Sequence, residues 1–143
     1  MIIKGERIIA SRAATPLLRH LLHGEENDRV TLLQGTEEDT RAAFADARNA
    51  AKKFALRHFI ISPESETSRA DAMMVLGLLA REFAFDPATA IVFEHDKPRA
   101  APTAFGTHWH CLLPEIDLAT GRVMDSGYSY LRHEKQPGSP NIR

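Results

Sequence analysis

The sequence has few of the residues that mark secreted or membrane-spanning proteins. It contains one cysteine, Cys111, in 143 residues, and a single thiol cannot form an internal disulfide. This cysteine follows two histidines on an expected strand and faces away from them, which favours a buried apolar role. No apolar run reaches the ~18 residues of a membrane span, and no charged-then-apolar leader predicts secretion. We therefore expect a cytoplasmic protein without a membrane partner.

Positive charge is not in excess, as it usually is in proteins that bind nucleic acid. The chain has 18 Lys and Arg against 19 Asp and Glu, a net charge of −1, whereas a basic patch is the usual footprint of such proteins. The distribution is uneven, because residues 1–23 hold four cations against one acid: Lys4, Arg7, Arg12 and Arg19 against Glu6. This excess predicts a local basic surface that binds DNA. Solvated charges around an edge strand are the alternative explanation.

What is present is an ordinary globular composition, with 43% hydrophobic and 26% charged residues. A chain of 143 residues is expected to form one domain with a single buried core. We place this domain at residues 1–135. Residues 136–143 contain two Pro, one Gly and one Ser, a composition that predicts a disordered tail.

Hydrophobic periodicity predicts the elements of the domain. Apolar residues recur at helical spacing over residues 16–23, 36–54 and 69–83, the last two being long helices. Strands are expected where apolar and β-branched residues cluster, over residues 1–10, 29–34, 56–62, 89–94, 109–116 and 122–125. The strand at 122–125 is expected to pair with the strand that holds His110. This order predicts an α+β fold, a mostly antiparallel central sheet with two long helices packed on it.

Three histidines flank a Pro-rich loop between two of these strands. Side chains alternate along a strand, so His108 and His110 point to the same face. If the hairpin register sets His95 opposite His108, the third imidazole joins that face. Three neutral imidazoles converging on one point bind a divalent metal and leave positions open for a substrate.

Two further observations bear on this interpretation. A carboxylate such as Asp96 or Glu94 could hold a ligand imidazole in the right tautomer. The alternative is that the histidines are ordinary polar residues of a half-exposed sheet, with Trp109 filling the core from the other face.

The pattern His95-Asp96, a loop, then His108-Trp109-His110 resembles the third motif of relaxases, the mobilisation nucleases of conjugative plasmids and members of the His-hydrophobic-His endonucleases. Residues 57–62, an apolar strand with His58 near its start and a final serine, are similar to the second motif. Residues 1–5, followed by 17–22 and Asn27, resemble the start of the family's small mobilisation-nuclease branch.

The resemblance implies a relaxase-like fold and a metal-dependent, site- and strand-specific endonuclease that nicks single-stranded DNA. Such a nuclease starts plasmid mobilisation at a transfer origin through a covalent protein–DNA intermediate. The implied cofactor is a divalent metal ion, Mg²⁺ or Mn²⁺ or another transition metal. The implied partners are single-stranded DNA and accessory transfer proteins.

Two positions depart from the family pattern. The family commonly carries a nucleophilic Tyr on its first helix, where this chain has His20, and often an Asn where this chain has Pro114. A neutral imidazole is a competent nucleophile, so we expect His20 to form a phosphoramidate, with Tyr128 and Tyr130 as the other candidates.

Two more residues are candidate members of the catalytic site. We expect His58 to order the site or contact phosphate, and Asp96 to support a ligand histidine. A catalytically silent relaxase relative that binds DNA or the transfer machinery is the second hypothesis. An unrelated metal-binding domain is the third.

Overall fold

The computed structural model of the protein describes residues 1–23, 29–97, 106–117 and 122–123. The expected tail at 136–143 lies outside the described residues, as do Tyr128 and Tyr130. The elements in chain order are β1 (Ile2–Ile9), α1 (Ala14–His23), β2 (Arg29–Gln34), α2 (Glu37–Asn49), β3 (Phe54–Ser62), α3 (Arg69–Phe83), the 3-10 turn η1 (Pro87–Thr89), β4 (Ile91–Asp96), β5 (Thr107–Pro114), β6 (Ile116–Asp117) and β7 (Arg122–Val123).

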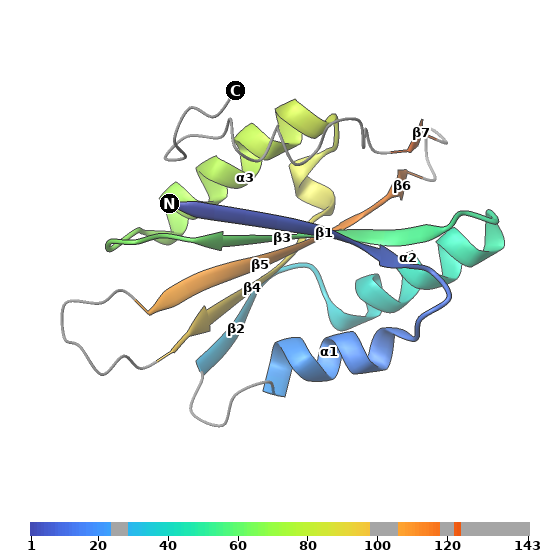
Figure 1. Ribbon diagram of the computed structural model, residues 1–143, viewed down its shortest axis with the longest axis horizontal. Helices are drawn as coiled ribbons and strands as arrows, with labels where there is room; N and C mark the ends of the chain where they lie inside the picture. The colour runs from blue at the N-terminus through green and yellow to red at the C-terminus, as the bar shows by residue number, and fades with distance from the viewer. Residues whose placement is uncertain (24–28, 98–105, 118–121, 124–143) are drawn as a thin grey trace.

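Five strands form one sheet in the order β1-β3-β5-β4-β2, and each neighbouring pair is antiparallel. Helices cover both faces: α1 and α2 lie on one side of the sheet and α3 on the other (Figure 1). The expected α+β class with an antiparallel central sheet is confirmed. Helices α2 and α3 lie on opposite faces of the sheet, and α1 is a third covering helix. None of the described helices has the length and apolar character needed to cross a bilayer.

Strand alternation gives the sheet two separate apolar cores. The core under α1 and α2 is built from buried residues that include Leu18, Leu21, Phe44, Leu56, Phe93 and Leu112. The core under α3 includes Phe59, Leu76, Leu79, Val92, Trp109 and Cys111. Successive residues of β5 therefore contribute to opposite cores, as a period of two requires. Burying both faces fixes the register, because a slip of one residue would exchange the two sets.

Helix boundaries follow local chemistry. Thr36 caps α2 and forms a capping box with Asp39, and Ser68 caps α3. The start of α3 at Arg69 and its end at Phe83 agree with the sequence prediction. By contrast, α1 begins at Ala14, two residues before the predicted start, so Pro16 lies within the first turn, where a missing N–H costs little.

The prediction that α2 continues to residue 54 is wrong. The helix ends at Asn49, and Ala51 adopts a left-handed conformation with φ of 56°. The N–H of Lys52 then donates to the carbonyl of Ala47 at 2.8 Å, which closes the helix end. Phe54 is the first residue of β3, so the lysine pair before it lies in a tight turn and not in a helix.

The predicted strand 109–116, which holds His110, is divided in the structure at Glu115 into β5 and β6, so the expected pairing with residues 122–125 is found at its end and not beside His110. The described part, Arg122–Val123, pairs instead with Ile116–Asp117 in a separate two-stranded ribbon. The physical reason is that β5 already has β3 on one side and β4 on the other, so neither of its edges is left to accept a third strand.

Candidate metal centre

The hairpin register places three histidines on one face of the sheet. His95 of β4 lies directly opposite His108 of β5, and His110 is two residues further along β5. The ring centroids are 5.1 Å apart for His95 and His108, 4.4 Å for His95 and His110, and 4.9 Å for His108 and His110. His95 and His110 are buried and His108 is half-buried. The predicted convergence is therefore present in the structure.

The spacing of these side chains suits one metal ion. One ligand nitrogen from each ring lies within 4.8 Å of the other two. Nitrogens bound to one ion at ~2.1 Å are roughly 3 to 3.5 Å apart, so small ring rotations would close the site. Within the described chain the group has three members, and three protein ligands are the pattern of a site that keeps a position for water or substrate.

Alternation also explains what lies around the centre. Trp109 and Cys111, between and beyond the β5 histidines, point into the core under α3. Burial raises the pKa of the Cys111 thiol to about 12, so this side chain acts as an apolar filler. Phe93 and Leu112 share the histidine face and continue into the core under α1 and α2. The three imidazoles therefore lie at the edge of the core under α1 and α2.

A hydrogen-bonded chain supports His110 from neighbouring strands. Nε2 of His58, on β3, lies 2.8 Å from Nδ1 of His110. Nδ1 of His58 lies 3.1 Å from a carboxylate oxygen of Glu6 on β1. Glu6 and His58 are direct cross-strand partners, so the antiparallel register itself brings them together. The sequence-predicted site residue His58 therefore joins the histidine group by contact with one of its members.

Hydrogen-bond accounting assigns the protons along this chain. A carboxylate only accepts, so Nδ1 of His58 donates to Glu6. The other nitrogen of a neutral imidazole accepts, so Nε2 of His58 receives the Nδ1 proton of His110. Nε2 of His110 then keeps its lone pair, the form that binds a metal.

Electrostatics favour the neutral forms that this assignment needs. Burial, helped by the neighbouring imidazoles His58, His95 and His108, lowers the pKa of His110 to about 2. Burial also lowers the pKa of His58, although the hydrogen bond from its ring to Glu6 acts in the opposite direction. Both rings are therefore neutral in the folded protein near neutral pH.

His20 lies within electrostatic reach of the same centre. Its side chain is exposed on α1, and its charge contributes to the lowered pKa values of both His58 and His110. The helix is anchored by Leu18 and Leu21, which are buried in the core under α1 and α2. The predicted apolar stripe of this helix thus places His20 towards solvent on the histidine side of the sheet.

The acidic residues next to His95 make contacts away from the imidazoles. Asp96 is exposed and accepts a hydrogen bond from the Thr107 hydroxyl at 3.3 Å. Glu94 accepts hydrogen bonds from Arg69 and from the Trp109 indole N–H, both on the α3 side. Both carboxylates leave the sheet on the face opposite to His95, as alternation requires. Among the contacts described for these strands, Glu6 is a carboxylate that reaches the histidine group through a hydrogen bond to His58, and the sequence prediction did not include it.

The four predicted DNA-binding cations do not form one surface. Lys4 shares the histidine face, where it pairs across the sheet with Ile60, and Arg19 is exposed on α1 beside His20. Arg12 lies in the turn after β1, at the opposite end of the sheet from the histidines, with its N–H bonded to the carbonyl of residue 9.

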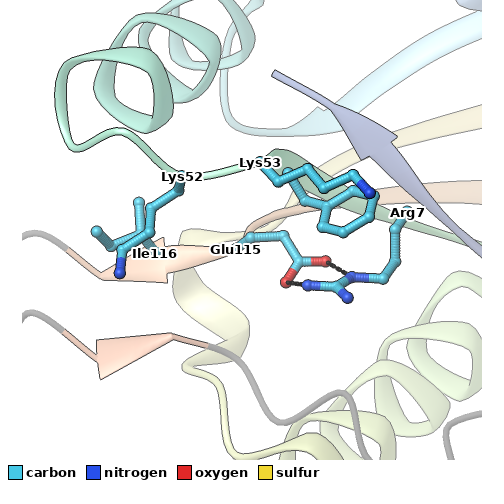
Figure 2. Close-up of a pocket in the computed structure, with 6 residues that line it drawn as sticks. Arg7, Lys52, Lys53, Glu115 and Ile116 are labelled. Carbon is cyan, nitrogen blue, oxygen red and sulfur yellow. Dashed lines mark hydrogen bonds and ion pairs between the residues drawn. The ribbon is translucent and has the colours of Figure 1, made fainter. Parts of the chain in front are cut away.

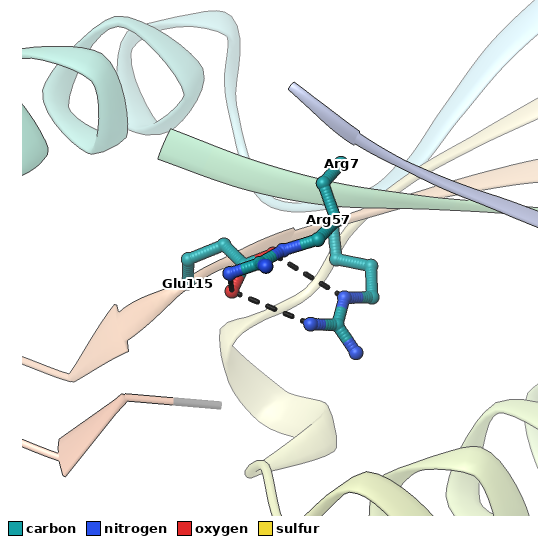
Figure 3. Close-up of polar contacts among 3 residues, drawn as sticks. All are labelled: Arg7, Arg57 and Glu115. Atoms are coloured by element: carbon teal, nitrogen blue, oxygen red, sulfur yellow. Dashed lines mark hydrogen bonds and ion pairs between the residues drawn. The ribbon is translucent and has the colours of Figure 1, made fainter. Parts of the chain in front are cut away.

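The fourth predicted cation, Arg7, lies on the face opposite to the histidines. Its Nε and Nη2 donate to the two carboxylate oxygens of Glu115 at 2.9 and 3.1 Å (Figure 3). Arg57, which is 1% exposed, donates to the same carboxylate at 3.3 and 3.5 Å. This ion cluster joins β1, β3 and the link between β5 and β6, which are far apart in sequence, and no local pattern predicts it.

Comparisons of the chain with models of protein families, with curated protein sequences and with solved structures found no match. The likeness to relaxases rests on the sequence motifs described above.

Proposed function

We propose that the histidine group binds a divalent metal ion and that the domain nicks single-stranded DNA as a relaxase-type mobilisation nuclease. The observation that carries the proposal is the register of His95 against His108, which gathers three imidazoles beside a supporting His58. The sheet arrangement agrees with the coarse fold that the resemblance implies. The resemblance assigns His95, His108 and His110 to the third motif of that family. It assigns His20 to the position of the family's first-helix Tyr.

Phosphodiester cleavage needs charge neutralisation and a nucleophile in line with the leaving oxygen. His95, His108 and His110 would hold the metal ion, which would supply the charge neutralisation. His20 supplies the second. Its unprotonated ring nitrogen attacks phosphorus, a P–N bond forms, and the bond to the 3′ oxygen breaks. The 3′ oxygen takes a proton from water, and the second ring nitrogen of His20 releases one to water.

The DNA strand is expected to cross the histidine face at the end of the sheet that holds the histidines, near His20 on α1. Lys4 and Arg19 are exposed there, whereas Arg12 lies at the far end of the sheet. Arg19→Ala should therefore weaken binding and lower the slope of log affinity against log salt by ~1 unit. Arg12→Ala removes the same charge at the remote end and is the matched control. Equal losses in both variants would contradict this path.

The ligand set bears on the choice of metal. Three imidazole nitrogens favour transition-metal ions over Mg²⁺, which prefers oxygen ligands. We therefore expect Mn²⁺ to bind more tightly than Mg²⁺, and Co²⁺, Ni²⁺ or Zn²⁺ more tightly still.

The test is the capture of a covalent adduct. The whole chain is incubated with Mn²⁺ and a pool of random-sequence single-stranded oligonucleotides, and the products are analysed by mass spectrometry. The parent should form an acid-labile adduct, His20→Ala should not, and His23→Ala, a histidine of the same helix, should retain it. An adduct that persists in His20→Ala and disappears in Tyr128→Phe or Tyr130→Phe would assign the nucleophile to a tyrosine.

The same experiment separates the second hypothesis. A parent protein that retains the oligonucleotides with a salt-dependent affinity, yet forms no adduct with any metal, would be a catalytically silent relative that binds DNA or the transfer machinery. If the parent protein also bound no metal ion, so that its metal affinity equalled that of His108→Ala, the proposed metal centre itself would be contradicted.

A further inference from the structure

A hydrogen-bonded group of three side chains lies behind the metal centre, on the opposite face of the sheet. The guanidinium of Arg69, the first residue of α3, donates from Nε and Nη2 to the two carboxylate oxygens of Glu94 at 2.9 and 2.8 Å. The indole Nε1 of Trp109 donates to the same carboxylate at 2.9 Å. We call these three side chains, Arg69, Glu94 and Trp109, the clamp.

The clamp joins the two strands that carry the histidines. Glu94 of β4 is the direct cross-strand partner of Trp109 of β5. This pair lies between the row that contains His95 and His108 and the row that contains His110. Because side chains alternate along a strand, the clamp lies on the α3 side of the sheet and the imidazoles lie on the other side. A change in the spacing or twist of the two strands at the clamp would therefore move the histidines of both strands.

His108 is the ligand whose position depends most on the clamp. The pairing of β3 with β5 ends at Ile61 and Trp109, one residue before His108. Among the described strands, the partner of β5 at His108 is β4. His110, by contrast, pairs with residues of both β3 and β4. The clamp therefore restrains the last row in which all three strands are joined, which is the point from which His108 extends.

The clamp differs from an ordinary surface ion pair. Arg69 is 60% exposed, but the Glu94 side chain is only 12% exposed and its carboxylate accepts three N–H donors. Exposed ion pairs contribute little, whereas a bidentate pair with a shielded carboxylate is stronger and more specific in its geometry. A cation in the first turn of a helix also opposes the helix dipole. Arg69 is thus placed against the electrostatic preference of α3, and its contact with Glu94 offsets that cost.

We propose that Arg69 is a positioning residue for the metal centre and acts through Glu94 and Trp109 on the strands that carry the three histidines. The inference rests on the metal centre of the proposed function and not on the cleavage of DNA. Loss of the clamp leaves the imidazoles in the protein but widens the range of distances between their ligand nitrogens. Metal binding then has to order the strands as well, so the affinity falls. The loss should be about tenfold, the lower limit for groups that contact a ligand histidine directly.

The test compares two arginine–carboxylate pairs in the whole chain. Arg69→Ala removes the cation of the clamp. Arg7→Ala is the matched control, because it removes a bidentate arginine from Glu115, which lies about 20 Å along the chain from Trp109 (Figure 2). Calorimetry well below the unfolding temperature measures Mn²⁺ affinity, so that a loss of stability alone leaves the affinity unchanged. Arg69→Ala should bind about tenfold more weakly than the parent, and Arg7→Ala should bind like the parent.

Two further measurements separate positioning from a merely structural role. Arg69→Lys keeps the charge with a single ammonium group and should recover part of the lost affinity. The absorption spectrum of bound Co²⁺ reports the coordination geometry of the ion. At saturation it should be altered in Arg69→Ala and unchanged in Arg7→Ala.

The outcomes distinguish this inference from the proposed function. Equal affinity and equal Co²⁺ spectra for Arg69→Ala and the parent, or equal losses in Arg69→Ala and Arg7→Ala, overturn the role of Arg69 and leave the metal centre standing. A parent that binds neither Mn²⁺ nor Co²⁺ contradicts the metal centre and the role of Arg69 with it. None of these results bears on adduct formation at His20, which tests the nuclease activity separately.

Discussion

His58 Nε2 lies 2.8 Å from Nδ1 of His110, and this contact sets which nitrogen of His110 carries a proton. Because Glu6 accepts from the far side of His58, the proton order runs along the three side chains towards the metal centre. The lone pair of His110 that remains points away from the chain of hydrogen bonds. In the proposed metal site, His58 is therefore a positioning residue for the three histidines, although it is not one of them.

This relationship predicts the effect of His58→Ala on metal affinity. Loss of a hydrogen-bond partner behind a ligand histidine weakens metal binding by ~10- to 100-fold, because the ring loses its orientation and its fixed tautomer. We expect this loss in Mn²⁺ affinity by calorimetry, and a smaller loss in Glu6→Gln, which keeps an acceptor without its charge. Asp96→Ala is the matched control, since Asp96 bonds to Thr107. An Asp96→Ala loss as large as that of His58→Ala would contradict the assignment.

The sequence predicted the histidine group and named His58 as a residue that could order it, but it did not predict the carboxylate of Glu6 behind His58, and the reason is physical. The alternation of His108 and His110 is local, and one antiparallel hairpin is enough to bring His95 to them. Glu6 reaches His58, which is 52 positions away in the chain, only through the pairing of β1 with β3. Register between distant strands is set by burial on both faces and not by any short pattern.

Local chemistry explains the other successes and errors in the same way. The cap at Ser68 and the apolar stripe of α3 lie within the segment, so its bounds could be predicted. The end of α2 could not be predicted, because Ala51 takes a left-handed conformation that is usual for glycine and rare for alanine. Strand β7 pairs with β6 and not with β5, because β5 already has β3 and β4 as its two neighbours. That arrangement is a property of the whole sheet.

Buried neutral histidines make the metal-free protein sensitive to acid. The folded-state pKa of His110 is lowered to about 2 and that of His58 is also lowered, while unfolded histidines titrate near ~6.5. Above pH ~6.5 both states are neutral and these groups contribute nothing to the pH dependence. Below it the unfolded chain binds protons that the folded chain does not, so stability falls as pH falls, by about 1.4 kcal/mol per unit for His110 alone.

Urea unfolding in a chelator at pH 8, 6.5 and 5 measures this dependence. His110→Leu should have a shallower loss between pH 6.5 and 5 than the parent. The carboxylate Glu94, whose pKa is lowered by its hydrogen bond to Arg69, loses its contribution only at more acidic pH. A parent with constant stability over the interval would mean that the rings are protonated in the folded state.

Two glycines provide opposite tests of the fold. Gly35, after β2, has φ of +76°, and a Cβ added there would lie 2.9 Å from Cγ1 and 3.1 Å from Cα of Ile91, whose side chain is fully buried. Gly35→Ala therefore adds left-handed strain to a clash with backbone that cannot move away, and we expect a loss of roughly 2 to 4 kcal/mol in unfolding free energy.

Gly77, within α3, has no atom within 4 Å of an added Cβ. Gly77→Ala should therefore stabilise the protein by about 0.5 to 1 kcal/mol through helix propensity. Denaturant unfolding of both variants measures the difference, and destabilisation by Gly77→Ala would contradict the open space around residue 77.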